Sequence, residues 1–110
     1  MAKGEYLGEF EHLVMLALLR LADNAYGVTV RREIEERTDR EVSIGAIYAT
    51  LDRLESKGYV RSHVGKPTPE RGGRAKRHFR VTARGIATIN RTHDVIRTMT
   101  DGLSVARSLA

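Results

Sequence analysis

The sequence has 110 residues, enough for one domain, with 19 Lys and Arg, 14 Asp and Glu, and a formal net charge of +5. It contains no cysteine, which excludes disulfides, thiolate metal sites and cysteine nucleophiles. The apolar run Leu13–Leu19 follows acidic residues rather than a basic leader, and it is far shorter than the ~20 residues that span a bilayer. We therefore expect a soluble, cytoplasmic protein without membrane contact.

The positive charge is concentrated in one part of the chain. Between Lys57 and Arg91 there are ten Lys or Arg residues and a single acid, Glu70, which gives a local net charge of +9. The other 75 residues carry nine bases and thirteen acids, a net charge of −4. A basic surface confined to one region is typical of proteins that bind nucleic acids.

The first predicted helix runs from about Gly8 to Ala22. Its apolar residues recur at three- and four-residue spacing and extend nearly all round the helix. Such a helix needs cover on more than one side, and in so small a domain a second subunit is a source of that cover. The residues of this helix that we expect at a dimer interface are Phe10, Val14 and Leu18.

A turn at residues 23–27 and a second helix, about Val28–Arg37, precede the most clearly bounded element, a third helix at Ile44–Lys57. Ser43 is its predicted N-cap and Gly58 its predicted C-terminal stop. The outward face begins with small residues, so its backbone can press close to a DNA groove; plain helix surface is the alternative interpretation. The inward face is Ile44, Ile47, Tyr48, Leu51 and Leu54, and the outward face is Gly45, Ala46, Ala49, Arg53, Ser56 and Lys57.

Two short strands, Tyr59–Val64 and Arg77–Val81, follow, joined by a loop too long for a tight turn. Within it the run Arg71–Arg77 places four cations and two glycines in seven residues. Glycine lets the backbone approach closely, and the forked arginine side chain suits phosphates and base edges. The run therefore indicates a basic hairpin tip that meets a polyanion; a solvated loop is the alternative.

A final long helix begins after Thr82, its predicted N-cap. Apolar residues on this helix form a seam close to a coiled-coil stripe. Because nothing within the chain is left to cover the whole seam, we expect a homodimer. The seam residues expected at its interface are Ile89, His93, Ile96, Met99 and Leu103.

The order helix, helix, helix, hairpin, helix is that of a winged helix-turn-helix, a mainly α fold with a small β-hairpin. Such a domain places its third helix in the DNA major groove and its hairpin wing on the backbone or the adjacent minor groove. Residues 1–82 are the predicted DNA-binding domain. Residues 83–110 are the predicted C-terminal dimerisation helix of the same compact unit.

The stretch Ser43–Val60 carries the pattern Ser-x-Gly-x-x-Tyr-x-x-Leu-x-x-Leu and leads through Gly58 into the wing. This pattern resembles the signature of the PadR family of transcriptional regulators, and the pair at 26–27 and the wing at 71–85 are also similar to it. The likeness extends from about residue 10 to residue 85. The single C-terminal helix is like the shorter branch of that family, whose members are compact homodimers. The resemblance implies a regulator, often a repressor of efflux or detoxification genes that loses DNA affinity on binding a small molecule.

Candidate DNA contacts lie on the third helix and on the wing. Ser43 combines N-capping with donation to a phosphate, and the Tyr48 ring packs inward or directs its hydroxyl to a phosphate. Arg53 contacts DNA or, alternatively, pairs with a neighbouring acid. The full set of predicted DNA-binding residues is Ser43, Gly45, Ala46, Tyr48, Ala49, Thr50, Arg53, Arg71, Arg74, Lys76 and Arg77.

Catalysis finds no support in the sequence, which lacks a phosphate-binding loop, a nucleophile elbow and a Ser/His/Asp order. His63 and His78 are expected to face each other across the hairpin, and His93 to interrupt the dimer seam. Without cysteine or metal-ligand spacing we predict no metal and no cofactor.

We therefore predict a homodimeric regulator that binds a palindromic double-stranded operator, most simply as a repressor, with an effector between the first and last helices. There is no tryptophan and there are only six aromatic residues, so planar multidrug ligands are a poor fit. The alternative is a winged-helix interaction module whose basic wing docks an acidic protein partner.

Overall fold

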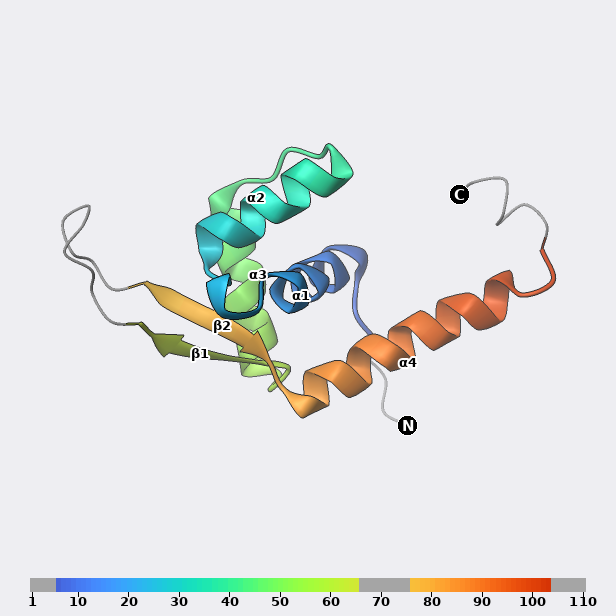
Figure 1. Ribbon diagram of the computed structural model, residues 1–110. Helices are drawn as coiled ribbons and strands as arrows, with labels where there is room; N and C mark the ends of the chain where they lie inside the picture. Colours follow the sequence, from blue (N-terminus) through green and yellow to red (C-terminus); the bar gives the residue numbers. More distant parts are fainter. Residues whose placement is uncertain (1–5, 66–75, 104–110) are drawn as a thin grey trace.

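The computed structural model describes residues 6–65 and 76–103, and within them the fold is mainly helical with one antiparallel hairpin, as predicted (Figure 1). The short 3-10 helix η1 lies where the sequence predicted only a turn. The elements in chain order are α1 (Glu9–Leu21), η1 (Ala22–Asn24), α2 (Gly27–Thr38), α3 (Ile44–Ser56), β1 (Val60–Val64), β2 (Arg77–Val81) and α4 (Ala83–Thr100).

The helix boundaries follow from local capping. The Ser43 hydroxyl accepts a hydrogen bond from the Ala46 N–H at 3.0 Å, and the Thr82 hydroxyl accepts one from the Gly85 N–H at 3.0 Å. Gly58, with φ of +81°, ends α3 in the conformation that glycine adopts most readily. These three predicted boundaries are confirmed.

The far end of α4 departs from the prediction. The helix ends at Thr100, and Gly102 follows with φ of +85°. Leu103 therefore lies beyond the helix, and the helical seam stops at Met99. The predicted seam extended to Leu103 because the spacing of apolar residues alone does not show where a glycine stops a helix.

Helix α1 occupies the centre of the molecule, with α2 on one side and α4 on the other (Figure 1). Its Val14, Met15 and Leu18 are at most 2 % exposed in the single chain. Val14 and Leu18, predicted at a dimer interface, thus belong to the chain's own core, because α2, α3 and β2 cover α1 from several sides. The exposed apolar side chains of α1 are Leu16 and Leu19.

The hairpin is joined to the helical body by backbone hydrogen bonds. In the register of β1 and β2, Val60 pairs with Val81 and Ser62 with Phe79. On its other edge β2 meets the segment before α2, where the Phe79 N–H donates to the Ala25 carbonyl at 2.9 Å. Since Phe79 is also only 1 % exposed, the hairpin has a fixed base. It projects away from the body on the side opposite to α4 (Figure 1).

Gly85 marks a close approach of three elements. A Cβ atom at this position would lie 2.2 Å from the Tyr59 carbonyl oxygen, 2.7 Å from Val81 Cγ1 and 2.9 Å from Met15 Cε. The backbone oxygen cannot move aside without displacing the start of β1. The glycine therefore allows α4 to pack directly against α1 and the hairpin.

Replacing Gly85 by alanine should lower the free energy of unfolding by about 1–3 kcal/mol, because the added methyl overpacks this contact. The matched control is Gly45→Ala on α3, where an added Cβ meets no atom within 4 Å. That substitution should stabilise the protein by about 0.5–1 kcal/mol, since alanine is the better helix former. Urea unfolding of both variants measures the difference, and equal effects would contradict the packing described.

Candidate nucleic-acid interface

The exposed ridge of α3 consists of small residues. Gly45, Ala46 and Ala49 are all exposed, and nothing lies within 4 Å of a Cβ placed at Gly45. Ser43 is exposed at the start of the ridge, where its oxygen caps the helix while its O–H remains able to donate. The ridge therefore lets the α3 backbone approach a DNA groove closely.

Thr50 does not belong to this ridge. It is only 2 % exposed, so its side chain is not available for the DNA contact that was predicted for it. Its hydroxyl accepts a hydrogen bond from Arg53 Nη2 at 3.3 Å. Position 50 lies three residues after Ile47 and four before Leu54, so it shares their buried stripe. The inward face of α3 is thus wider than the apolar residues alone indicate.

Tyr48 joins α3 to the start of α2. A Cβ on Gly27 would lie 2.3 Å from both Cζ and Oη of Tyr48, so only glycine leaves room for this ring. The ring packs against the α2 backbone, and the residue stays 38 % exposed. The two sequence motifs that contain Gly27 and Tyr48 therefore meet in space, with the phenol hydroxyl beside the first turn of α2.

Glu11 of α1 holds the other flank of α3. Its carboxylate accepts hydrogen bonds from Arg53 Nε at 3.3 Å, from Lys57 Nζ at 3.1 Å and from the Gly8 N–H at 3.1 Å. Burial by itself would raise the pKa of Glu11, but the Gly8 N–H and the two cations outweigh it and hold the pKa below its ordinary value. Arg53 thus pairs with an acid, although with one on α1 and not with a neighbour on α3.

Arg77 binds the wing to α3. Its guanidinium pairs with Glu55 and, at 3.2 Å, with Asp52, and it also lies over the Phe79 ring at 4.8 Å. Glu55 accepts hydrogen bonds from the N–H and hydroxyl of Ser62, and these, with Arg77, lower its pKa despite partial desolvation. Predicted as a DNA contact, Arg77 is engaged by two carboxylates and fixes the angle between wing and helix.

The other predicted wing cations divide into two groups. Lys76 lies 4.5 Å above the Tyr26 ring, and its Nζ donates to the Tyr26 hydroxyl at 3.3 Å. It is exposed beside the first turn of α2. Arg71 and Arg74 lie outside the residues that the structure describes, so their predicted DNA contacts stay predictions.

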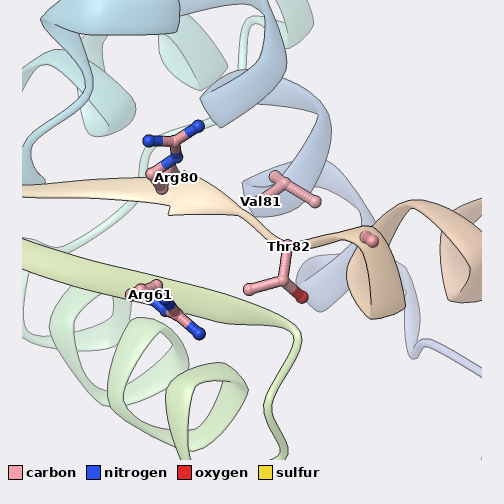
Figure 2. A pocket seen from close by; sticks show the side chains of 5 residues that line it. Arg61, Arg80, Val81 and Thr82 are labelled. Carbon is pink, nitrogen blue, oxygen red and sulfur yellow. The ribbon is translucent and has the colours of Figure 1, made fainter.

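The outer face of the hairpin carries a pair of arginines that the sequence analysis missed. Arg61 and Arg80 stand directly opposite each other in the strand register and line a hollow of about 350 Å³ (Figure 2). Neither forms an ion pair within the described residues, and Figure 2 shows their guanidinium groups pointing apart. Like charges in this position repel and add to the positive potential of the wing. Only the strand register reveals the pairing.

The histidines of the hairpin behave as predicted. His63 and His78 stack with ring centroids 5.5 Å apart and an interplanar angle of 19°. No cluster of three potential metal ligands occurs in the described parts of the chain. Nor does any helix in those parts have the length and apolar character needed to cross a membrane.

The predicted dimer residues fall into three environments. Val14, Leu18 and Ile89 are buried in the chain, and Phe10 is half-buried. His93 is exposed on α4. Ile96, Met99 and Leu103 are 59 %, 75 % and 52 % exposed, so unburied apolar surface gathers at the far end of the chain.

Comparison with protein-family models identifies the architecture. Residues 15–91, most of the chain, match the transcriptional regulator PadR-like family. The protein belongs to the PadR-like family. It is accordingly a transcriptional regulator with a winged-helix fold.

Solved structures show the same fold at low sequence identity. A PadR-like transcription factor from Bacteroides fragilis is 17 % identical, with a TM-score of 0.71, and the match covers 92 % of this chain and 89 % of that one. A PadR family regulator from Clostridium difficile is 19 % identical, with a TM-score of 0.69 and coverage of 92 % and 99 %. The winged-helix DNA-binding protein F93 from STIV is 18 % identical, with a TM-score of 0.68 and coverage of 88 % and 97 %. Comparison with curated proteins gave no significant match.

Two carboxylates in the ion pairs that hold α3, Glu11 of α1 and Glu55 of α3 itself, make the stability of this PadR-like chain depend on pH. Because the pKa values of Glu11 and Glu55 are lower in the folded protein than their ordinary value of 4.5, their stabilisation is complete above that value. It is lost as the pH falls through the lowered values. The double variant Glu11→Gln/Glu55→Gln should therefore show a smaller loss of unfolding free energy between pH 5 and pH 3 than the wild type. Urea unfolding at each pH measures it, and parallel pH profiles would contradict the role given to the two carboxylates.

Proposed function

We propose that this PadR-like regulator acts as a homodimer on a palindromic operator, with α3 in the major groove and the wing on phosphates or the adjacent minor groove. The observation that carries the proposal is the small-residue ridge of α3, which is exposed and held from both sides by ion pairs. The two α3 helices of a dimer would enter successive major grooves about 34–36 Å apart. Occupation of the operator would repress transcription by excluding polymerase.

The proposed arrangement gives different roles to two parts of the chain. Residues 1–82 would form the DNA-binding unit and residues 83–110 the dimerisation element. Beyond Thr92, the last buried residue of α4, the helix extends away from the body (Figure 1). Val95, Ile96 and Met99 are exposed there, and a second copy of the chain would cover them.

An effector would bind between α1 and α4 at the dimer interface. Burial lowers the pKa of His12 on α1, and the charge of His93 on α4 lowers it further. A small ligand there would change the spacing of the two α3 helices and so the affinity for the operator.

Substitution of the ridge tests the placement of α3. Ala49→Glu should abolish operator binding, because it adds bulk and a negative charge where the DNA backbone and bases approach. Ala87→Glu, an equal change at an exposed position of α4, should leave binding largely unchanged. Genomic fragments selected by the wild type supply the operator for gel-shift titration. A fully active Ala49→Glu variant would contradict the placement.

Salt dependence tests the electrostatic part of the interface. If each subunit neutralises about three phosphates, the logarithm of the affinity should fall against the logarithm of salt concentration with a slope near −5, at about −0.9 per contact. Fluorescence anisotropy at several salt concentrations measures the slope. Binding that does not depend on salt would exclude a phosphate interface and favour an acidic protein partner for the wing.

The dimer is tested at the far end of α4. Ile96→Lys and Met99→Lys should convert dimer to monomer in analytical ultracentrifugation, because each places a charge in the proposed apolar contact. Thr98→Lys, on the same exposed stretch but outside the predicted seam, is the matched control and should remain dimeric. A wild type that sediments as a monomer at micromolar concentration would contradict the proposed assembly.

A further inference from the structure

Arg53 and Lys57 lie on the flank of α3 that faces α1, beside the proposed groove-reading ridge. They are four residues apart, one helical turn, and their side chains are 52 % and 40 % exposed. Two free cations at this place would lie close to a DNA backbone bound along the ridge. In the structure, however, both are directed to Glu11.

The direction of Arg53 is fixed by two contacts. Its Nε donates to Glu11 at 3.3 Å, and its Nη2 donates to the buried Thr50 hydroxyl at 3.3 Å. Both acceptors belong to the body of the chain, so the guanidinium lies back against α1 and α3 instead of extending from the ridge. Lys57 is drawn to the same carboxylate at 3.1 Å.

Glu11 is itself held firmly. Its side chain is only 12 % exposed, and its second oxygen accepts the Gly8 N–H. The preceding Leu7 N–H donates to the Thr92 hydroxyl of α4 at 3.0 Å in a buried hydrogen bond. The start of α1 is thus anchored to α4 on one side and to α3 on the other. A carboxylate fixed in this way keeps its two cations in place at low entropic cost.

We propose that Glu11 is a positioning residue that withholds Arg53 and Lys57 from the DNA backbone and so keeps binding to non-operator DNA weak. The inference rests on the proposed placement of α3 in the major groove. Contacts between cations and phosphates supply most of the affinity for DNA of any sequence, and they strengthen operator and non-operator binding alike. Neutralising two cations in each subunit therefore lowers the affinity for all DNA but improves the discrimination between operator and non-operator sequences.

The anchor at Thr92 gives this arrangement a connection to the proposed dimerisation helix. A displacement of α4 would pull on Leu7, shift the start of α1 and loosen the contact of Glu11 with Arg53 and Lys57. Thr92→Val removes the hydroxyl with little change in shape. Like the loss of the Glu11 charge, this substitution should raise the affinity for non-operator DNA, but by a smaller factor.

The test compares Glu11→Gln with Glu9→Gln. The second substitution removes the same charge from the same helical turn, but among the described residues Glu9 pairs with Arg40 alone, at 3.0 Å. Affinities for operator and scrambled duplexes are measured over a range of salt concentrations. Glu11→Gln should bind the scrambled duplex several-fold more tightly, with a lower ratio of operator to scrambled affinity. Its salt slope should steepen by about 0.9 for each cation released. Glu9→Gln should keep the wild-type slope.

A triple variant identifies the cations responsible. Glu11→Gln/Arg53→Gln/Lys57→Gln should return the slope to the wild-type value. If Glu11→Gln weakens both duplexes with an unchanged slope, or if Glu9→Gln reproduces its effect, Glu11 has a merely structural role and the proposal is wrong.

A measurement without DNA separates this proposal from the proposed function. In urea unfolding, Glu11→Gln and Arg53→Gln should be non-additive, because each removes the same ion pair. Additive effects would overturn the contact on which the proposal depends. A wild type that binds neither duplex, with non-additive unfolding, would instead overturn the DNA-binding function and leave Glu11 as a structural residue.

Discussion

Helix α3 packs onto the core through Ile47, Leu51 and Leu54, all fully buried, and this burial decides which face the helix presents to solvent. Apolar burial supplies most of the energy of such a contact but is not directional. Ion pairs on both flanks supply direction, from Glu11 of α1 on one side and from Arg77 of the wing on the other. The ridge and the wing therefore take their relative positions from the way in which α3 is held.

The charges of the basic region have different roles in the folded chain. Arg77 is neutralised by α3 and Lys57 by α1, whereas Arg61 and Arg80 repel each other without an acidic partner in the described residues. The net charge of this region therefore overstates the number of cations free to meet phosphates. Attraction at long range depends on the total charge, but contact at short range depends on the cations that the fold leaves unpaired.

Features fixed by neighbouring residues were predictable from the sequence. The caps at Ser43 and Thr82, the glycine stop at Gly58 and the strand Arg77–Val81 all depend on a few consecutive residues, and the structure has them where they were predicted. The order of the elements then restricts the fold to very few topologies, and the spaced motifs on α3 and the wing narrow it to one family.

Features that depend on tertiary packing were not predictable in this way. Thr50 is buried because the protein interior covers a wider part of the α3 surface than its apolar residues alone indicate. Val14 is buried because other elements of the same chain surround α1. The partner of Arg53 lies 42 residues away in the sequence, and the opposition of Arg61 and Arg80 follows only from the strand register. Spacing along the chain identifies exposed and buried faces, but it does not tell which charged residues the fold brings together.

DNA cleavage from a tethered iron chelate shows whether the small-residue ridge of α3 enters the major groove. Because the chain has no cysteine, Gly45→Cys and Glu36→Cys each provide a single attachment point, on the ridge and on the exposed face of α2. The chelate at position 45 should cut the operator in two clusters one helical turn apart, about 10–10.5 base pairs. Strong cleavage from position 36 with none from position 45 would mean that α2, and not the ridge of α3, lies against the DNA.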